Sequence, residues 1–195
     1  ADSTGVITLG LVGVGTVGTV VTGGGADVIT LKTAALTTGD YSISTGAGND
    51  SLVLQFVEGF NWNGGLGYDT LKMDSTFDLT GQTVSLSNVD AIELDTSNNG
   101  TETLTITAAT FSTNPSFTLL GGGTNADNLI VTGLETSDTI NASAVSVEVG
   151  EAFLTLNGNG GADTITGSEF ADIINGGAGA DVMSGGNFAD TYIFN

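Results

Sequence analysis

Four aspartates near the end of the chain follow one another at intervals of nine residues. They are Asp163, Asp172, Asp181 and Asp190, and each closes a glycine-containing stretch such as GGAGAD at residues 176–181. A carboxylate is a hard oxygen donor, and a glycine-rich turn can curl tightly enough for backbone carbonyl oxygens to converge beside it. Repetition of this combination at a fixed interval indicates a row of cation sites.

The residue types that are missing decide which cation suits these sites. The sequence contains no histidine and no cysteine, which excludes disulfides and most sites for zinc, copper or iron. Hard oxygen ligands suit Ca²⁺, which takes roughly six to eight of them. One short turn cannot supply that many, so we expect stacked turns to share an ion, Asp163 with Asp181 and Asp172 with Asp190.

The aspartates belong to a nonapeptide that recurs along the chain. Residues 158–193 read GNGGADTIT, GSEFADIIN, GGAGADVMS and GGNFADTYI. Looser copies upstream contain Asp27, Asp50, Asp69 and Asp127. An apolar residue two positions after the aspartate is typical of a short strand that points one side chain inward. The expected inward residues are Ile29, Leu52, Leu71, Ile92, Leu129, Ile140, Ile165, Ile174, Met183 and Tyr192.

The spacing of the aspartates predicts the architecture. Positions 27, 50, 69, 90, 127, 163 and 181 recur at about 19 residues if one coil is skipped before 127 and one before 163. A constant coil length is typical of a parallel β-solenoid, in which each turn of chain bonds to its neighbours. We therefore expect an all-β, right-handed parallel β-solenoid or β-roll, with these aspartates in Ca²⁺-binding turns on one edge.

We expect residues 1–195 to form a single continuous solenoid that is a fragment of a longer chain. Sparse glycine–aspartate loops occupy residues 1–75, and dense ones occupy residues 121–195. Residues 76–120 lack such loops, but TVSLSNVDAIELD and TETLTITAATF keep the alternation of strands, so metal-poor coils are expected there. The 31 glycines and the absence of a long helical period disfavour helices.

The charge of the chain limits its partners. The chain contains two basic and 22 acidic residues, which gives a net charge of −20. A chain of this charge would be repelled by nucleic acid and by anionic lipid. A hydrophobic content of 39% is too high for a solvated acidic tail, so cations must neutralise the carboxylates of a folded chain. No apolar stretch approaches the length of a membrane-spanning helix, so no membrane insertion is expected.

The nonapeptides resemble the RTX, or haemolysin-type, calcium-binding repeats of proteins exported by type I secretion. In that family, aspartates and backbone carbonyls of successive loops hold Ca²⁺, and the last three positions of each repeat form a strand of a parallel β-roll. The resemblance implies several Ca²⁺ ions held by Asp27, Asp50, Asp69, Asp127, Asp163, Asp172, Asp181 and Asp190. The implied carbonyl ligands are those of Gly158, Gly160, Gly176, Ala178, Gly185 and Asn187.

Two repeats depart from the family pattern. Phe170 and Phe188 stand where the fourth residue is normally glycine, and Asn159 replaces a second glycine. The sites on the edge of Asp172 and Asp190 are therefore the ones that we expect to be distorted or empty.

The sequence offers no catalytic centre. Without histidine or cysteine, the usual nucleophilic triads and zinc-water sites are excluded, and only a carboxylate pair could act. Glu93 with Glu102, or Glu148 with Glu151, lacks the aromatic and basic surroundings of such a pair. We expect no enzymatic activity.

The chain is most similar to the calcium-dependent bacterial surface-layer (S-layer) proteins of the RTX group. The resemblance implies a secreted structural protein at the bacterial cell surface that folds on calcium and self-associates into a lattice. One alternative is the RTX folding and secretion module of a larger secreted enzyme, toxin or adhesin. Another is a polysaccharide-binding solenoid with a platform around Trp62, although core filling or a solenoid cap is the favoured interpretation of Phe60 and Trp62, because large aromatic side chains mostly pack.

Overall fold

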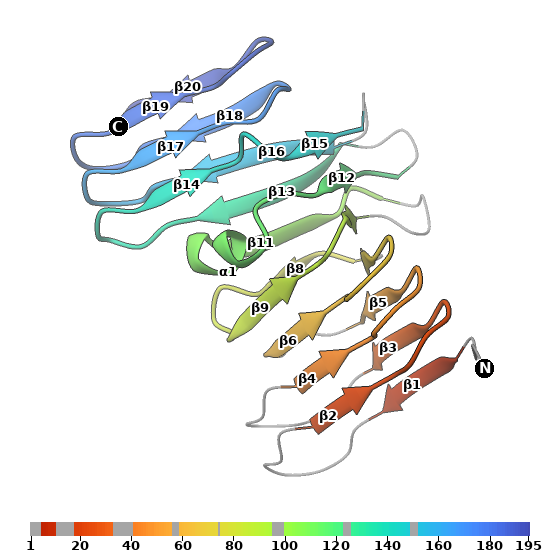
Figure 1. Cartoon of the computed structure of the whole chain (residues 1–195). Helices are drawn as coiled ribbons and strands as arrows, with labels where there is room; N and C mark the ends of the chain where they lie inside the picture. The colour runs from red at the N-terminus through yellow and green to blue at the C-terminus, as the bar shows by residue number, and fades with distance from the viewer. Residues whose placement is uncertain are drawn as a thin grey trace.

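The chain coils into a stack of parallel strands that runs from the N-terminal end to the C-terminal end (Figure 1). The computed structural model describes residues 5–10, 18–32, 41–55, 59–73, 75–94, 100–122, 126–148 and 152–195, with the backbone alone for residues 7–10. Strands of successive coils pair in parallel, as in Ser51 beside Thr70 and Leu154 beside Asp172. The prediction of an all-β parallel β-solenoid is confirmed.

Two sheets form the N-terminal half of the stack. Sheet 1 contains β1 (Val6–Gly10), β3 (Val28–Lys32), β5 (Ser51–Leu54), β7 (Thr70–Met73), β10 (Ala91–Glu93), β12 (Thr118–Leu120) and β15 (Ser146–Val147). Sheet 2 contains β2 (Gly18–Val21), β4 (Tyr41–Ser44), β6 (Phe60–Asn63) and β9 (Val84–Ser87).

Two further sheets carry the stack to its C-terminal end. Sheet 3 contains β8 (Phe77–Asp78), β11 (Thr103–Thr107), β13 (Asp127–Thr132), β16 (Ala152–Asn157), β18 (Asp172–Asn175) and β20 (Thr191–Ile193). Sheet 4 contains β14 (Thr139–Asn141), β17 (Thr164–Thr166) and β19 (Val182–Ser184). Sheets 1 and 3 overlap in the middle of the stack, where the coils are consequently three-sided.

A short helix, α1 (Ala108–Thr113), lies between β9 of sheet 2 and β14 of sheet 4. The threonines of α1 bond to β9, because Thr110 Oγ1 donates to the Val84 carbonyl (3.1 Å) and Thr113 Oγ1 accepts from the Leu86 N–H (2.9 Å). The expectation of continuous strand alternation through TETLTITAATF is wrong after Thr107. The Thr107 hydroxyl caps the Thr110 N–H at 3.0 Å and starts a helix there.

The expected coil length of about 19 residues is also wrong, since the mean is about 23. Equivalent residues lie 18 apart between Asp163 and Asp181, but 25 apart between Asp138 and Asp163. The difference arises because a three-sided coil includes an extra strand or α1, whereas a coil with two sheets has only two strands. Nothing in the repeat pattern marks this change.

The change of sheets also separates aspartates that the sequence placed on one edge. Asp27, Asp50, Asp69 and Asp90 precede or adjoin strands of sheet 1, but Asp127 begins β13 of sheet 3. Asp163 and Asp181 precede strands of sheet 4. The aspartates therefore occupy different corners of the coil, and the single predicted edge does not exist.

The apolar residues that follow the aspartates line the interior. Ile29 lies beside Leu52, Leu52 beside Leu71, and Leu71 beside Ile92, so these side chains form one continuous buried row. Eight of the ten expected inward residues are buried; Met183 is half-buried and Tyr192 is 39% exposed. Tyr192 lies in β20, which pairs with β18 alone.

Trp62 is part of this core. Phe60 and Trp62 are each 1% exposed, and Trp62 Nε1 donates to Thr45 Oγ1 at 3.4 Å. A buried ring cannot act as a platform for a sugar, so the interpretation of Trp62 as a polysaccharide-binding site is wrong.

Truncation of the buried row should cost stability, with an exposed leucine as the control. We expect Leu52→Ala to lower the free energy of unfolding by about 2–5 kcal/mol, because it leaves a cavity between Ile29 and Leu71. Leu66 is 74% exposed, so Leu66→Ala should cost within about 0.5 kcal/mol. Denaturant unfolding at saturating calcium measures both values; equal losses would contradict the described core.

Candidate calcium-binding turns

The tandem segment contains turns with two left-handed residues each. The backbone φ angle is 87° at Gly177 and 142° at Gly179, and 70° at Asn159 and 118° at Gly161 in the preceding coil. Stacked turns are joined at their third residue, since the Ala178 N–H donates to the Asn159 carbonyl (2.7 Å) and the Gly161 N–H donates to the Ala178 carbonyl (2.9 Å). The second and fourth positions of the nonapeptide therefore shape the turn.

Close stacking explains the glycines at these positions. A side-chain carbon on Gly177 would overlap the Asn159 carbonyl oxygen, and one on Gly179 would overlap the Gly161 carbonyl oxygen. A positive φ angle is also costly for other residues. Both constraints favour glycine at the second and fourth positions of a stacked turn.

One carboxylate oxygen of Asp181 and one of Asp190 accept a hydrogen bond from the coil before. The Asp163 N–H donates to Asp181 Oδ1 (3.0 Å), and the Asp172 N–H donates to Asp190 Oδ1 (3.0 Å). These are the two stacked pairs that the 18-residue spacing predicted, and they lie at different corners of the coil. The Asp138 N–H likewise donates to Asp163 Oδ1 (2.8 Å), so each corner carries a column of carboxylates.

The second oxygen of Asp163 has no hydrogen-bond partner although the residue is only 1% exposed. It lies against Gly158, where a side-chain carbon would overlap both this oxygen and the Gly176 carbonyl oxygen. The first glycine of the nonapeptide thus makes room for a carboxylate oxygen and a carbonyl oxygen of the next coil. A carboxylate oxygen without a partner beside a carbonyl oxygen in a buried turn suits a cation.

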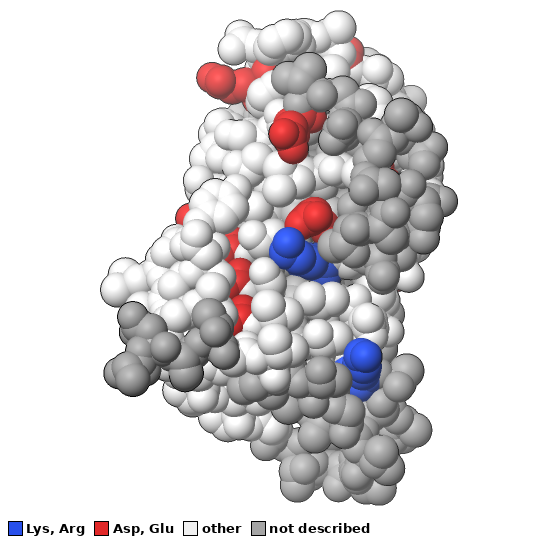
Figure 2. Space-filling view, turned by 90° about the vertical axis from the view of Figure 1, so that its right-hand side faces the viewer, with Lys and Arg blue, Asp and Glu red and all other residues white. Residues whose placement is uncertain are grey.

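The upstream turns have the same construction. The Asp27 N–H donates to Asp50 Oδ1 (2.8 Å), the Asp50 N–H to Asp69 Oδ1 (2.9 Å) and the Asp69 N–H to Asp90 Oδ2 (2.8 Å). The second oxygens of Asp27, Asp50 and Asp69 are buried without a partner. Figure 2 views the right-hand side of Figure 1 and shows acidic side chains one above another on this face.

The upstream backbone repeats that of the tandem turns in detail. Gly46 and Gly48 have φ angles of 92° and 136°, and Gly65 and Gly67 have 103° and 131°. The Leu66 N–H donates to the Gly46 carbonyl (2.8 Å), and the Gly48 N–H donates to the Leu66 carbonyl (2.7 Å). These two bonds correspond to the two that join Ala178 to residues 159–161 in the tandem turns. The loose copies that contain Asp50 and Asp69 are the same turn.

Burial and mutual repulsion act on these carboxylates. Burial raises the pKa of Asp69, its hydrogen bond from the Asp50 N–H opposes the rise, and the negative charges of Asp50 and Asp90 add to it. Partners of the opposite sign are scarce, and Lys72 bonds to Glu93 at 2.9 Å. The column therefore favours a proton or an external cation.

Asp127 and Asp172 differ from Asp27, Asp50, Asp69 and Asp163 because hydrogen-bond donors reach both of their carboxylate oxygens. Asp127 Oδ1 accepts from the Glu102 N–H (2.8 Å) and its Oδ2 from the Gly122 N–H (2.8 Å). Asp172 Oδ2 accepts from the Ser168 N–H (2.6 Å), and the Ser168 hydroxyl donates to both carboxylate oxygens at 3.0 and 3.1 Å. Neither carboxylate has a bare oxygen to offer an ion.

The two phenylalanines that break the nonapeptide pattern stack on each other. The Phe170 and Phe188 rings have centroids 5.8 Å apart and planes 8° apart. Phe188 has a φ angle of 66°, whereas neither Ser168 nor Phe170 has a positive φ angle. The turn at residues 167–172 therefore has a different backbone from the glycine turns, and the expected distortion is present there. Burial raises the Asp172 pKa to about 6, against the lowering effect of its hydrogen bonds from Ser168.

The expected carbonyl ligands lie in or beside the stacked turns. The carbonyls of Gly176 and Gly185 face the Cα atoms of Gly158 and Gly167, and that of Gly158 faces Gly133. Gly160 and Ala178 form the bridge between two turns, and the Ala178 carbonyl already accepts a hydrogen bond. Asn187 is in the exposed turn before Asp190.

A calcium shell here would consist mainly of backbone oxygens. Within the ranges that the structure describes, no three acidic side chains gather into a metal-ligand cluster. A pocket of about 230 Å³ opens at the turn of Asp181, with Gly176, Gly177 and Gly179 in its wall. One or two carboxylates together with converging carbonyls fit the oxygen preference of Ca²⁺.

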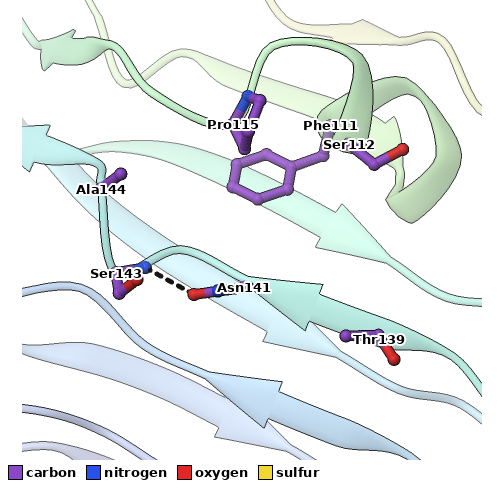
Figure 3. Close-up of a pocket in the computed structure, with 7 residues that line it drawn as sticks. All are labelled: Phe111, Ser112, Pro115, Thr139, Asn141, Ser143 and Ala144. Atoms are coloured by element: carbon purple, nitrogen blue, oxygen red, sulfur yellow. Dashed lines mark hydrogen bonds between the residues drawn. The ribbon is translucent and has the colours of Figure 1, made fainter.

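A larger cavity offers no comparable chemistry. It has a volume of about 400 Å³, and α1, Pro115 and the end of β14 line it (Figure 3). Its walls contain Phe111, Thr139 and Asn141 but no ionisable side chain, and the Ser143 N–H donates to Asn141 Oδ1 at 3.1 Å. It therefore provides no general acid or base.

A scan for known families matched residues 157–192 with the RTX calcium-binding nonapeptide repeat, in four copies. This segment is an array of RTX repeats. The RTX segment comprises the turns of Asp163, Asp172, Asp181 and Asp190, and repeats of this kind typically bind Ca²⁺ and imply a secreted protein of type I secretion. Searches of curated proteins and of solved structures each found no match. Among the residues described, no helix is long and apolar enough to cross a membrane.

Sequence reasoning missed the hydrogen bonds that build the columns. It treated the aspartates as ligands only, whereas one oxygen of each stacked aspartate accepts an N–H of the coil before. It also missed Glu102, whose N–H donates to Asp127 and whose position 25 residues earlier is the only signal. The role of the first glycine, which leaves room for a carboxylate oxygen, also needed coordinates.

Acid should partly replace calcium in holding the fold. The Asp172 pKa is raised from 3.8 to about 6, so the folded form binds this proton more tightly than the unfolded chain. Stability without metal should then rise as the pH falls from about 6 towards 4, and the Asp69 shift acts in the same direction. Circular dichroism in chelator should show more β signal at about pH 5 than at about pH 7. The response should be smaller in Asp172→Asn, and a loss of β signal on acidification would contradict the shift.

Proposed function

We propose that the chain is a calcium-dependent extracellular structural protein, a module of a surface layer that folds and assembles when calcium binds. The observation that carries this proposal is the set of buried carboxylate oxygens without hydrogen-bond partners in Asp27, Asp50, Asp69 and Asp163. A chain of net charge −20 cannot neutralise them from its own lysines. External cations are therefore part of the folded state.

Each part of a turn has a separate role in this proposal. The carboxylate oxygen that bonds to the preceding coil sets the register between coils, and the other oxygen binds the ion. Glycines at the second and fourth positions turn backbone carbonyls towards the next coil. Calcium supplies the positive charge that lets stacked carboxylates lie close together.

The energetics of calcium binding favour a chain that is unfolded inside the cell and folded outside it. Extracellular calcium modules have dissociation constants of about 10⁻⁴ to 10⁻³ M, and a site at ten times its Kd contributes about 1.4 kcal/mol. Several sites together reach the total stability of a typical domain. Low calcium inside the cell would leave the chain unfolded for export, and millimolar calcium outside would fold it.

Calcium should drive folding cooperatively. A calcium titration followed by circular dichroism should show a steep gain of β signal that a chelator reverses. Magnesium at the same concentration is the control, because its preference for a small octahedral shell suits these turns poorly. A chain that is equally folded in chelator would contradict the switch.

Two aspartates that carry the same backbone hydrogen bond should differ in their effect on calcium binding. Asp181 belongs to an RTX turn, whereas Asp90 follows the left-handed Asn88 in a different loop. Asn can still accept the N–H of Asp163 or Asp69, so each change removes only the charge. We expect Asp181→Asn to raise the calcium midpoint more than Asp90→Asn, and equal midpoints would contradict the assignment.

The strand edges at the two ends of the stack support self-association. β20 pairs only with β18, and Phe194 beside it is 80% exposed. Unpaired parallel edges are able to extend a sheet into another molecule. Electron microscopy at millimolar calcium should show sheets or filaments that dissolve in chelator, and a protein that stays monomeric would refute the lattice.

The RTX segment also supports a second candidate, in which the chain is the folding module of a larger secreted enzyme, toxin or adhesin. The observation in its favour is the match of residues 157–192 with repeats that occur in secreted proteins. Full-length sequencing of the gene distinguishes the two, since a catalytic or adhesive domain on the same chain would favour the module.

A further inference from the structure

Asparagine followed by glycine recurs where strands end and turns begin. In the part of the chain that the structure describes, the pair starts at Asn63, Asn157, Asn159 and Asn175, and Asn99 lies outside that part. The pair is chemically labile, because glycine has no side chain to hinder attack of its backbone nitrogen on the asparagine side-chain carbonyl carbon. The structure decides at which of these pairs the attack is free to occur.

Three of the four glycine nitrogens are held by hydrogen bonds to a stacked coil. The bonds run from the Gly64 N–H to the Ser87 carbonyl (3.0 Å), from the Gly158 N–H to the Asn175 carbonyl (2.8 Å) and from the Gly160 N–H to the Leu134 carbonyl (3.2 Å). A nitrogen that attacks must first give up such a bond, which slows the reaction by about tenfold.

The Gly176 nitrogen is the exception. Asn175 lies opposite Ile193 in the pairing of β18 with β20, but no acceptor among the described residues bonds to the Gly176 N–H. Gly176 and Asn195 also line the pocket of about 230 Å³ at the turn of Asp181, so water has access to this nitrogen. The nitrogen is therefore free to lose its proton and attack.

The carbonyl group that this nitrogen would attack is polarised. Asn175 Oδ1 accepts a hydrogen bond from the Gly177 N–H (3.1 Å) and another from Asn195 Nδ2 (3.1 Å). Negative charge develops on Oδ1 when a nitrogen adds to Cγ, and donors already aimed at the oxygen stabilise that charge. Asn63 Oδ1 accepts a single bond, from Asn88 Nδ2 (2.7 Å).

We propose that Asn175 is a self-modification site, at which the folded protein converts the side-chain amide into a carboxylate, whereas Asn63, Asn157 and Asn159 are protected. The Gly176 nitrogen gives its proton to water and bonds to Asn175 Cγ. The side-chain nitrogen takes up a proton and leaves as ammonia with the electron pair of the broken C–N bond. Water then opens the five-membered succinimide at either carbonyl and leaves aspartate or isoaspartate.

The carboxylate next to Gly176 does not account for the difference. A side-chain carbon on Gly176 would overlap Asp181 Oδ2, and one on Gly158 would overlap Asp163 Oδ2 in the same way. Asn157 therefore has the same charged neighbour as Asn175 and differs in the bonded nitrogen. This inference is independent of the proposed function, because it needs only the folded chain and water.

Modification at Asn175 would disturb the end of the stack. An isoaspartate carries the main chain through the side-chain carbons and adds one atom between residues 175 and 176. The Gly158 N–H bonds to the Asn175 carbonyl, and the turn of Asp181 begins at Gly176. The added atom shifts this turn against the coil before it, so the reaction limits the lifetime of the last coils.

Peptide mapping by mass spectrometry tests the site in the full chain. Cleavage before aspartate releases residues 172–180, in which Asn175 is the single asparagine. After incubation of the folded chain at mildly alkaline pH, we expect the mass gain of deamidation at Asn175 about tenfold faster than at Asn63 or Asn159.

The same three sites provide the internal control. Asn63, Asn159 and Asn175 each begin the sequence Asn-Gly-Gly, so their rates should become similar in denaturant. Circular dichroism of the incubated sample verifies that the chain is folded. Similar rates at the three sites in the folded chain would overturn the inference and leave calcium-dependent folding untouched.

Two variants test the parts of the site. Asn175→Gln should abolish the mass gain in residues 172–180, because ring closure through the longer side chain is slow, and Asn63→Gln should leave that gain unchanged. Asn195→Ala removes one donor to Oδ1 and should slow the reaction at Asn175 by about two- to tenfold. An unchanged rate in Asn195→Ala would refute the role of the polarised carbonyl.

Discussion

A buried carboxylate oxygen without a hydrogen-bond donor is the feature on which the ends of this solenoid depend. Asp50, Asp69, Asp163 and Asp181 each use one carboxylate oxygen to accept the N–H of an aspartate in the coil before, as Asp50 does for Asp27. The bond brings successive carboxylates to the spacing of stacked strands, where two charges repel by roughly 3 kcal/mol at an effective dielectric constant of about 20. The hydrogen bond that sets the register thus creates the repulsion that a cation must relieve.

The width of the coil decides how much of its stability depends on the aspartate turns. The three-sided coils in the middle enclose a broad apolar interior that includes Phe77, Leu79, Phe111 and Phe117, all of them buried. Coils near the C-terminal end have only two strands and a repeat of 18 residues, and Met183 is only half-buried there. A narrow coil buries less apolar surface per residue, so a larger share of its stability must come from the turns. The unpartnered carboxylates lie in two-sheet coils and at the boundary of the three-sided ones.

Local features of the sequence predicted local features of the structure. Alternation after each aspartate placed Ile29, Leu52 and Leu71 in the core, and the spacing of Asp163 and Asp181 predicted their stacking. Coil length was not predictable, because it depends on whether a segment such as residues 108–113 continues as a strand or turns into a helix capped by Thr107. The exchange of sheets follows from these insertions, and with it the corner at which Asp127 lies.

The sequence also could not predict which carboxylates are hydrogen-bonded within their own turns, for a related reason. All the nonapeptides contain aspartate at the sixth position, but the backbone conformation of the turn decides whether an N–H reaches the carboxylate. Ser168 and Gly177 occupy the same position of the repeat, yet only Ser168 donates to its aspartate. This conformation distinguishes a carboxylate that its own turn satisfies from one with a bare oxygen, and the sequence indicates it only through the preference of glycine for positive φ angles.

The corner of Asp172 is held together by side chains that the other corners lack. Phe188 holds a φ angle of 66°, a conformation that costs a residue with a side chain about 1–2 kcal/mol. Its ring stacks on Phe170 one coil before, and an aromatic pair of this kind returns about 0.5–1.5 kcal/mol beyond its burial. Ser168 supplies the donors that an ion would otherwise make unnecessary. Hydroxyl and aromatic side chains at this corner therefore stabilise a turn that lacks the glycines of the others, which explains why a departure from the repeat pattern leaves the coil in register.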